Sequence, residues 1–196
     1  MHPNLITLAT FCFVTSFTPG PNNILASYSG FNFGIKKTFP LMLGVALGYT
    51  SVVFVLDIGL ITVFKKFPII QEIIKILGSV FLIYLAYKIS FSKSSNDNVT
   101  KNPVKFINTF FFQFMNPKAV VVAIITVSTF VTMDENYVLY STWVVGVSFF
   151  FACVSITFWS LLGKFLRKFA TNQNFIKRFN YVMSILLVSC IITFYI

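Results

Sequence analysis

Six long apolar stretches, separated by short segments that carry most of the charge, restrict the fold of this chain more than any other feature. Of its 196 residues, 57% are hydrophobic and only 10% are charged. A soluble domain of this length needs more polar side chains than that to cover its surface. A helix crosses a bilayer with about 20 apolar residues. The sequence therefore predicts an integral membrane protein.

The apolar stretches predict an all-α fold with six transmembrane helices. They do not alternate polar and apolar residues as the strands of a membrane barrel do. The predicted helices cover residues 4–29, 41–63, 69–91, 106–131, 137–161 and 179–196. We expect a single membrane domain over 1–196, in which a polar linker at 92–104 separates one repeat at 1–91 from another at 105–196. Because each repeat has an odd number of helices, the second would be inverted relative to the first.

The basic residues predict the orientation in the membrane. The segments after the first, third and fifth helices carry Lys36, Lys37, Lys88, Lys93, Lys101, Lys105, Lys164, Arg167, Lys168, Lys177 and Arg178, whereas the other side has only Lys65, Lys66 and Lys75. Positive loops stay in the cytoplasm, so both termini are predicted outside. The net charge of +10 then reflects membrane topology and not nucleic-acid binding.

Three prolines interrupt the predicted helices. Pro19 and Pro21 lie in the first helix and Pro117 lies in the fourth. Each removes a backbone hydrogen bond and clashes with the preceding turn, at about 3 kcal/mol in a regular helix. The interrupted helices are the first members of the two repeats. Interruptions at corresponding positions of two halves point to the binding site of a transporter.

A broken helix also suggests what would bind. The N–H groups that begin the second half-helix suit a carboxylate, and the carbonyls freed at the end of the first suit an ammonium. Together they favour a zwitterion, which means an amino acid. The predicted substrate-binding residues are Thr18, Pro19, Gly20, Pro21, Asn22, Asn23, Gln113, Asn116, Pro117 and Lys118. The alternative is a purely structural kink.

Two of the charged residues inside the predicted helices are candidates for a function. Asp57 lies about 7.5 Å from the centre of 41–63 and is a candidate for proton coupling or for contact with a substrate ammonium. The alternative is an interfacial aspartate that is solvated from outside or paired with Lys65 or Lys66. Lys118 could bind a substrate carboxylate, neutralise Asp57 in one state, or only snorkel toward water.

Other classes of function have less support. Cys12, Cys153 and Cys190 form no C-x-x-C pair, and His2 is the only histidine, so we expect no metal site, no cofactor and no enzyme. The sequence has no GxxxxGK[ST] phosphate loop, so we expect an ion gradient rather than ATP to supply energy. A channel for small polar solutes stays open as the alternative, because channels also contain broken helices.

At these residues the chain resembles a known family. "TPGPNN" in the first helix, the glycines of "SGFNFG" and "GVALGY", "ILGSVFLIYLAYK" in the third helix and "QFMNPKA" in the fourth are similar to the lysine exporter (LysE/RhtB) family. The resemblance runs over the whole chain, and the P-G-P-N element is its most specific part. The segment "GFNFGIKK" departs from the arginine-rich run that is usual after the first helix.

The resemblance implies a six-helix protein of the bacterial inner membrane that exports amino acids or their derivatives, driven by the proton gradient. It marks Pro19, Gly20, Pro21, Asn22, Asn116, Pro117 and Lys118 as the signature residues. Members differ in their cargo, so the resemblance does not say which amino acid is carried. The sequence does not decide between a monomer and a homodimer.

Overall fold

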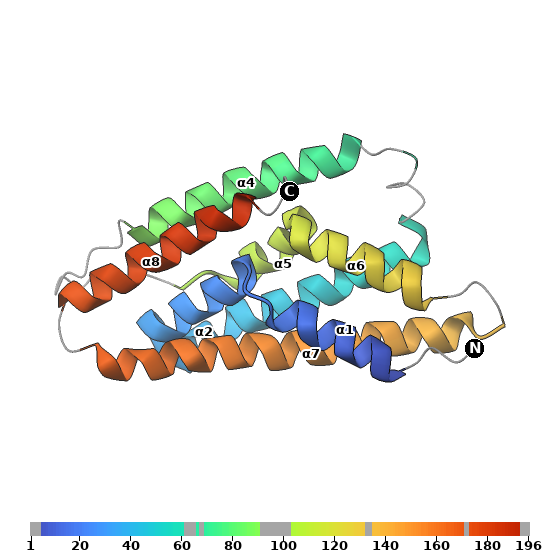
Figure 1. The fold of residues 1–196 in the computed structure, drawn as a ribbon, viewed down its shortest axis with the longest axis horizontal. Coiled ribbons are helices and arrows are strands. Elements are labelled where there is room, and N and C mark those ends of the chain that lie inside the picture. Colours follow the sequence, from blue (N-terminus) through green and yellow to red (C-terminus); the bar gives the residue numbers. More distant parts are fainter. Residues whose placement is uncertain are drawn as a thin grey trace.

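The computed structural model describes residues 5–60, 66, 69–90, 103–131, 135–170 and 173–192, and within them it contains helices and no strand. The elements are α1 (Leu5–Phe17), α2 (Pro21–Val55), the π-helix η1 (Leu56–Leu60), α4 (Ile69–Ser90), α5 (Phe106–Met115), α6 (Pro117–Phe130), α7 (Tyr137–Leu166), the 3₁₀ turn η2 (Arg167–Phe169) and α8 (Gln173–Ile192). Figure 1 shows that α4, α7 and α8 run along the length of the molecule.

The helices have the length and the surface of membrane-spanning helices. Four are long and apolar enough to cross a bilayer, and the bent pair α5 and α6 adds a fifth. Large apolar side chains face outward, among them Ile6, Phe54, Ile83, Val138 and Ile185, each about half exposed or more. The prediction of an all-helical chain is confirmed. Six spans in two inverted repeats stay a prediction.

Gly34 divides α2 into two parts that the sequence had predicted as separate helices. Its φ of 73° and ψ of 168° are not helical. The hydroxyls of Ser29 and Thr38 lie 2.9 Å apart, although residues nine apart in a straight helix are separated by about 13.5 Å. The chain therefore turns at Gly34, and 35–55 runs back along the molecule (Figure 1). The connection predicted at 30–40 was wrong, because residues on both sides of this single glycine are helical and Pro40 lies inside the second part.

Some predicted boundaries also needed correction. The helix predicted at 137–161 extends to Leu166, and the one predicted at 179–196 begins at Gln173. Both extensions contain Lys or Arg, which are good helix formers and can carry their charge to the membrane surface on long apolar stems. The helix at 69–91 and the interruption of 106–131 were predicted correctly, and α5 and α6 meet at 63° around Asn116.

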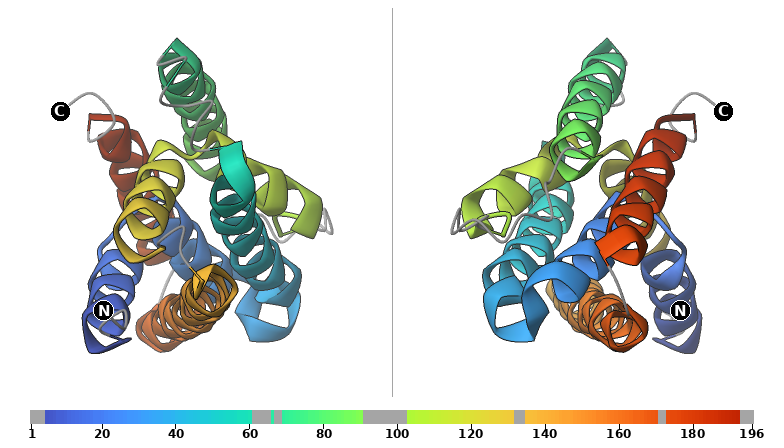
Figure 2. Two further views of the ribbon diagram at one scale, coloured as in Figure 1. Left: turned by 90° about the vertical axis from the view of Figure 1, so that its right-hand side faces the viewer. Right: turned by 90° about the vertical axis from the view of Figure 1, so that its left-hand side faces the viewer.

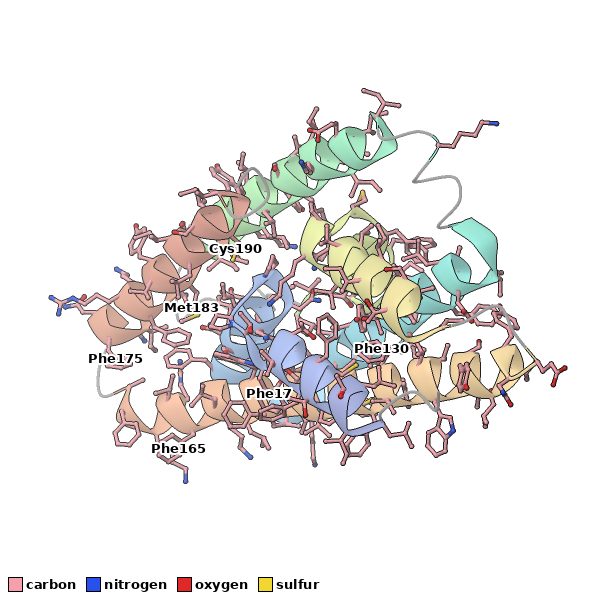
Figure 3. The ribbon with its side chains drawn as sticks, turned by 45° about the vertical axis from the view of Figure 1, so that its right-hand side comes forward. Phe17, Phe130, Phe165, Phe175, Met183 and Cys190 are labelled. Carbon is pink, nitrogen blue, oxygen red and sulfur yellow. The ribbon has the colours of Figure 1, made fainter. Side chains whose placement is uncertain are left out.

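Two apolar clusters hold the helices together. One joins the start of α2 to α4 and α8 and includes Leu25, Leu82 and Leu187. Met183 and Cys190 of α8, labelled in Figure 3, pack against it. The other joins α1, the end of 35–55, α6 and α7; it includes Phe130, also labelled there. Figure 2 shows α4 and α8 on one side of the bundle, with α7 and α1 on the other.

Close backbone contact fixes α2 against α7. A Cβ on Gly30 would lie 2.0 Å from the Ser160 carbonyl oxygen, and a Cβ on Gly163 would lie 2.0 Å from that of Ser27. Ser27 also donates a hydrogen bond to the Trp159 carbonyl at 2.9 Å. This reciprocal contact of small residues is typical of helices that pack in a bilayer.

The paired glycines of the sequence have two different roles. Gly30 packs against α7, while Gly44 and Gly48 pack against the backbone of α5, where a Cβ would lie 2.5 and 2.6 Å from the carbonyl oxygens of Phe106 and Phe110. A Cβ on Gly34 would meet nothing within 4 Å. Close packing therefore explains three of these glycines, and the turn explains the fourth.

We predict that Gly163→Ala destabilises the protein, by about 1–3 kcal/mol as expected for overpacking, because α2 and α7 must move apart. The measurement is thermal unfolding of the purified protein in detergent. The matched control is Gly146→Ala in the same helix, where an added Cβ meets nothing within 4 Å. Equal unfolding temperatures for the two variants would contradict this account of the contact.

Candidate functional site

Both predicted helix breaks are present in the structure. α1 ends at Phe17, labelled in Figure 3, and α2 begins at Pro21 after an extended Gly20 with φ −169° and ψ 178°. In the second half α5 ends at Met115 and α6 begins at Pro117, with Asn116 also outside the helical region at φ −88° and ψ 103°. In both cases a proline begins the second helix, where its missing N–H removes no helical bond.

The two helices that begin at these breaks have no side-chain cap. Pro21 and Pro117 occupy the first turn. Gly20 has no side chain with which to cap α2, and the side chain of Asn116 makes no capping hydrogen bond to α6. The next two residues of α2 are Asn22 and Asn23, and those of α6 are Lys118 and Ala119. Their N–H groups have no carbonyl one turn earlier within the same helix. Two partly positive helix ends result.

Both helix ends border the same cavity. Its empty space, including the part that opens to solvent, is about 520 Å³. The lining residues are Thr15, Ser16, Gly20, Pro21, Asn22, Asn23, Val45, Tyr49, Asn116, Lys118, Ala119, Val122, Ala152, Ser155 and Ile156. No acidic residue is among the described residues that line it.

The cavity lies between the two apolar clusters. Val45 and Ile156 belong to the cluster with α4 and α8, and Tyr49 packs against the cluster with α1 and α6. Polar groups of the breaks therefore meet between the two apolar clusters.

The carbonyls freed at the end of α1 already have partners inside the protein. The Lys118 ammonium donates to the Thr18 carbonyl at 2.7 Å and lies 3.4 Å from that of Pro19. The Asn23 amide donates to the carbonyls of Ser16 and Thr18 at 2.8 and 3.0 Å, and Ser155 donates to that of Ser16 at 2.7 Å. Side chains from α2, α6 and α7 thus replace the hydrogen bonds that the break removes.

A pair of amides joins the two breaks. Asn22 donates to Gln113 at 2.8 Å, and Gln113 donates back to Asn22 at 3.0 Å and to the Thr109 carbonyl at 2.9 Å. Gln113 is fully buried. A buried amide that loses its partner costs about 1–3 kcal/mol, so this pair favours one arrangement of α2 against α5.

Asn116 leaves an acceptor unused at the cavity. The residue is 1% exposed, and its side-chain oxygen Oδ1 has no hydrogen-bond partner in the described part of the chain. Buried polar atoms are seldom left in this state, so an unpaired acceptor beside a cavity indicates a place where a ligand or water donates.

Asp57 lies apart from the cavity. It is in η1, two turns beyond Tyr49, which is about 12 Å along the helix. The residue is 1% exposed, which excludes the alternative of a solvated interfacial side chain. Ser141 of α7 donates a short hydrogen bond to Oδ2, and Oδ1 has no partner among the described residues. The alternative partner Lys65 lies outside the described residues.

The structure brings most of the predicted substrate-binding residues to one place. Gly20, Pro21, Asn22, Asn23, Asn116 and Lys118 line the cavity. Thr18, Pro19 and Gln113 lie behind it, where they hold lining residues through hydrogen bonds, and Pro117 begins α6. Whether these residues bind a substrate stays a prediction.

The sequence analysis missed the contribution of α7. Ser141, Ser148 and Ser155 are spaced seven residues apart, which is nearly two helical turns, so they share one face. Ser141 bonds to Asp57, Ser148 lies 3.9 Å from the Cys12 sulfur, and Ser155 bonds to the first break. The regular spacing of these serines in an apolar helix was the available signal.

Comparisons with known proteins agree with this architecture. The chain is 31% identical over 196 residues to the cysteine/O-acetylserine efflux protein of Escherichia coli (strain K12), with 97% of each chain covered. It is 32% identical over 197 residues to the protein of the same name from Salmonella choleraesuis, again with 97% of each chain covered. No solved structure gave a significant match. The family model described as LysE type translocator matches residues 13–195, and the chain therefore belongs to that family.

Proposed function

We propose that the protein is a secondary active exporter that moves an amino acid or a close derivative out of the cytoplasm by proton antiport. The observation that carries this proposal is that the two broken helices, far apart in sequence, begin at one cavity between two apolar clusters. Membership of a translocator family and the efflux proteins among the relatives support it.

The cavity offers complementary groups for a zwitterion. The uncapped starts of α2 and α6 present N–H donors and partial positive charge, which suit a carboxylate. The end of α1 presents carbonyls and partial negative charge, and the unpaired Oδ1 of Asn116 is a further acceptor for an ammonium. The ten residues predicted at the breaks are thus the proposed binding site, six at its wall and four behind it.

The lining favours a small cargo with a neutral side chain. Val45, Val122, Ala152 and Ile156 form an apolar wall, and no acid among the described lining residues could pair with a second cationic group. A side chain such as that of lysine would lose water there without gaining a charge partner, which is unfavourable. Cysteine and O-acetylserine, the cargoes in the names of the two relatives, fit this description.

The proposed architecture is two inverted three-helix repeats. The first comprises α1 with 21–33, then 35–60, then α4; the second comprises α5 with α6, then α7, then α8. Each interrupted helix packs on the second helix of the other repeat, since Gly30 contacts α7 and Gly44 contacts α5. Rocking of the two repeats about this interface would expose the cavity to each side in turn.

A channel is the alternative function, since a wet cavity at broken helices also occurs in channels. A channel would conduct without saturation at low solute concentration and without coupling to protons. Saturation and coupling are therefore the properties that separate the two.

We predict that inside-out vesicles containing the protein take up L-cysteine, kept reduced, and O-acetylserine with saturation when the interior is acidified, and take up L-lysine far more weakly. Uptake is expected to collapse with an uncoupler. Uptake that rises linearly with solute concentration and does not depend on the proton gradient would support the channel instead.

The matched control for this transport is a pair of adjacent substitutions. Val122 lines the cavity, whereas Val121 is 45% exposed on the outer surface of α6. Val122→Phe should reduce uptake at least about tenfold, because the ring fills space needed by cargo, and Val121→Phe should leave it within about twofold. Equal uptake by both variants would mean that the cargo does not bind in this cavity.

Asp57 is the proposed proton carrier, because it is a buried acid. In the described part of the chain, Ser141 donates to its carboxylate and the hydroxyl of Tyr137 donates to the backbone carbonyl of Asp57. Asp57→Asn should abolish uptake driven by the proton gradient and keep downhill exchange of cargo. Ser141→Ala keeps the acid and should keep coupling. An unchanged pH dependence in Asp57→Asn would exclude this role.

For the orientation, we propose that both termini face outward and the basic loops face the cytoplasm of a bacterial inner membrane. Alkaline phosphatase fused after Ile196 should be active and a fluorescent protein fused there should be dark. The opposite pair of results would reverse the orientation.

A further inference from the structure

Lys118 occupies the position that a substrate ammonium would take. Its Nζ lies 2.7 Å from the Thr18 carbonyl oxygen and 3.4 Å from that of Pro19, at the C-terminal end of α1. The side chain comes from the other break, about a hundred residues later in the chain. Lys118 also lines the cavity, as does Gly20, the residue that follows Thr18 and Pro19 in the chain.

The local backbone is arranged to admit this ammonium. A Cβ on Gly20 would lie 3.0 Å from both Cδ and Nζ of Lys118, so any other residue at this position would crowd the lysine. Gly20 itself has an extended backbone that any residue can adopt. The backbone conformation does not require a glycine here, and a Cβ would need the end of the Lys118 side chain to shift slightly.

The charges favour a cation at this point. The end of α1 carries the partial negative charge of a helix C-terminus, and its free carbonyls are acceptors that lipid cannot satisfy. No acidic side chain is present among the described lining residues. An ammonium at these carbonyls therefore stabilises the empty cavity through hydrogen bonds and the helix dipole alone.

We propose that Lys118 is a resident substitute for the cargo ammonium. In the empty carrier Lys118 fills the subsite formed by the carbonyls of Thr18 and Pro19; in the loaded carrier the ammonium of the amino acid takes this subsite and displaces Lys118. The proposal rests on the proposed function and adds to it that Lys118 competes with the cargo ammonium for this subsite. The unpaired Asn116 Oδ1 offers a second acceptor during the exchange.

The exchange of Lys118 for the cargo ammonium has a role in the transport cycle. An exporter must return empty, and in that step, without Lys118, the Thr18 carbonyl would keep only its bond from Asn23 and the Pro19 carbonyl would have no partner among the described residues, at a depth where lipid offers none. Lys118 supplies the partner, so the empty carrier can change its orientation. Without Lys118, the carrier would change its orientation readily only when cargo is bound. Exchange of cargo for cargo would then continue while net export stops.

The first test is chemical rescue, which does not depend on transport. Ethylammonium is added to purified full-length Lys118→Ala, where the removed side chain leaves room for it. We expect a saturable rise of about 2–4 °C in the unfolding temperature, as for a ligand that binds the folded state several-fold above its Kd. If Lys118→Ala cannot be purified alone, recovery of folded protein with ethylammonium in the buffer is the same readout.

Three controls define the site. The wild type should not respond, because Lys118 already fills the subsite, and neither should Lys36→Ala, which removes an exposed lysine. Tetramethylammonium has no N–H donor and should not stabilise Lys118→Ala. Absence of stabilisation by ethylammonium, or an equal response in the wild type, would overturn the proposal whatever the protein transports.

The second test separates net export from exchange in proteoliposomes with labelled L-cysteine, kept reduced. Lys118→Met should lower the ratio of net efflux into cargo-free buffer to cargo exchange by about tenfold or more relative to the wild type. If Lys118 instead binds the cargo carboxylate, both activities fall together, which contradicts the proposal. Absence of both activities in the wild type would count against the proposed function, while the rescue result still decides the role of Lys118.

Discussion

The need to satisfy backbone groups inside an apolar bundle governs the middle of this protein. Each helix break frees N–H and carbonyl groups at a depth where lipid provides no partner. The carbonyls at the end of α1 are bonded by side chains of Asn23, Ser155 and Lys118, which come from three different helices. The same bonds hold those helices together, so the breaks contribute to the packing that surrounds them.

The carbonyl groups and the N–H groups at the breaks differ in whether the protein supplies their hydrogen-bond partners. The carbonyls have partners within the protein, whereas the starts of α2 and α6 have no side-chain cap and face the cavity with Asn116 Oδ1. Such a site can recognise a small charged molecule by dipoles, without a carboxylate at its wall. Asp57 lies two helical turns away, which separates proton binding from cargo binding in the proposed mechanism.

Most of what could be predicted from the sequence rested on the positions of prolines and charged residues. Pro19, Pro21 and Pro117 identified both breaks because proline disrupts the interior of a helix and is tolerated in the first turn of a new one. The sequence predicted a connection between 29 and 41, but not that it would be a turn at the single residue Gly34 with Pro40 inside the next helix, because a glycine in an apolar run can pack closely, as Gly30 does, or permit a positive φ. Only the neighbours of each glycine distinguish these roles.

By itself the sequence determined that the chain is helical, apolar enough for a membrane and interrupted at two related positions, since these properties depend on local composition and on the chemistry of single residues. The tertiary structure decided that the two breaks share one cavity, that Asn22 pairs with Gln113, and that Lys118 reaches the carbonyls of Thr18 and Pro19. These contacts join residues about a hundred positions apart. They depend on how close the helices approach, which small residues such as Gly30 and Gly163 allow and no local pattern specifies.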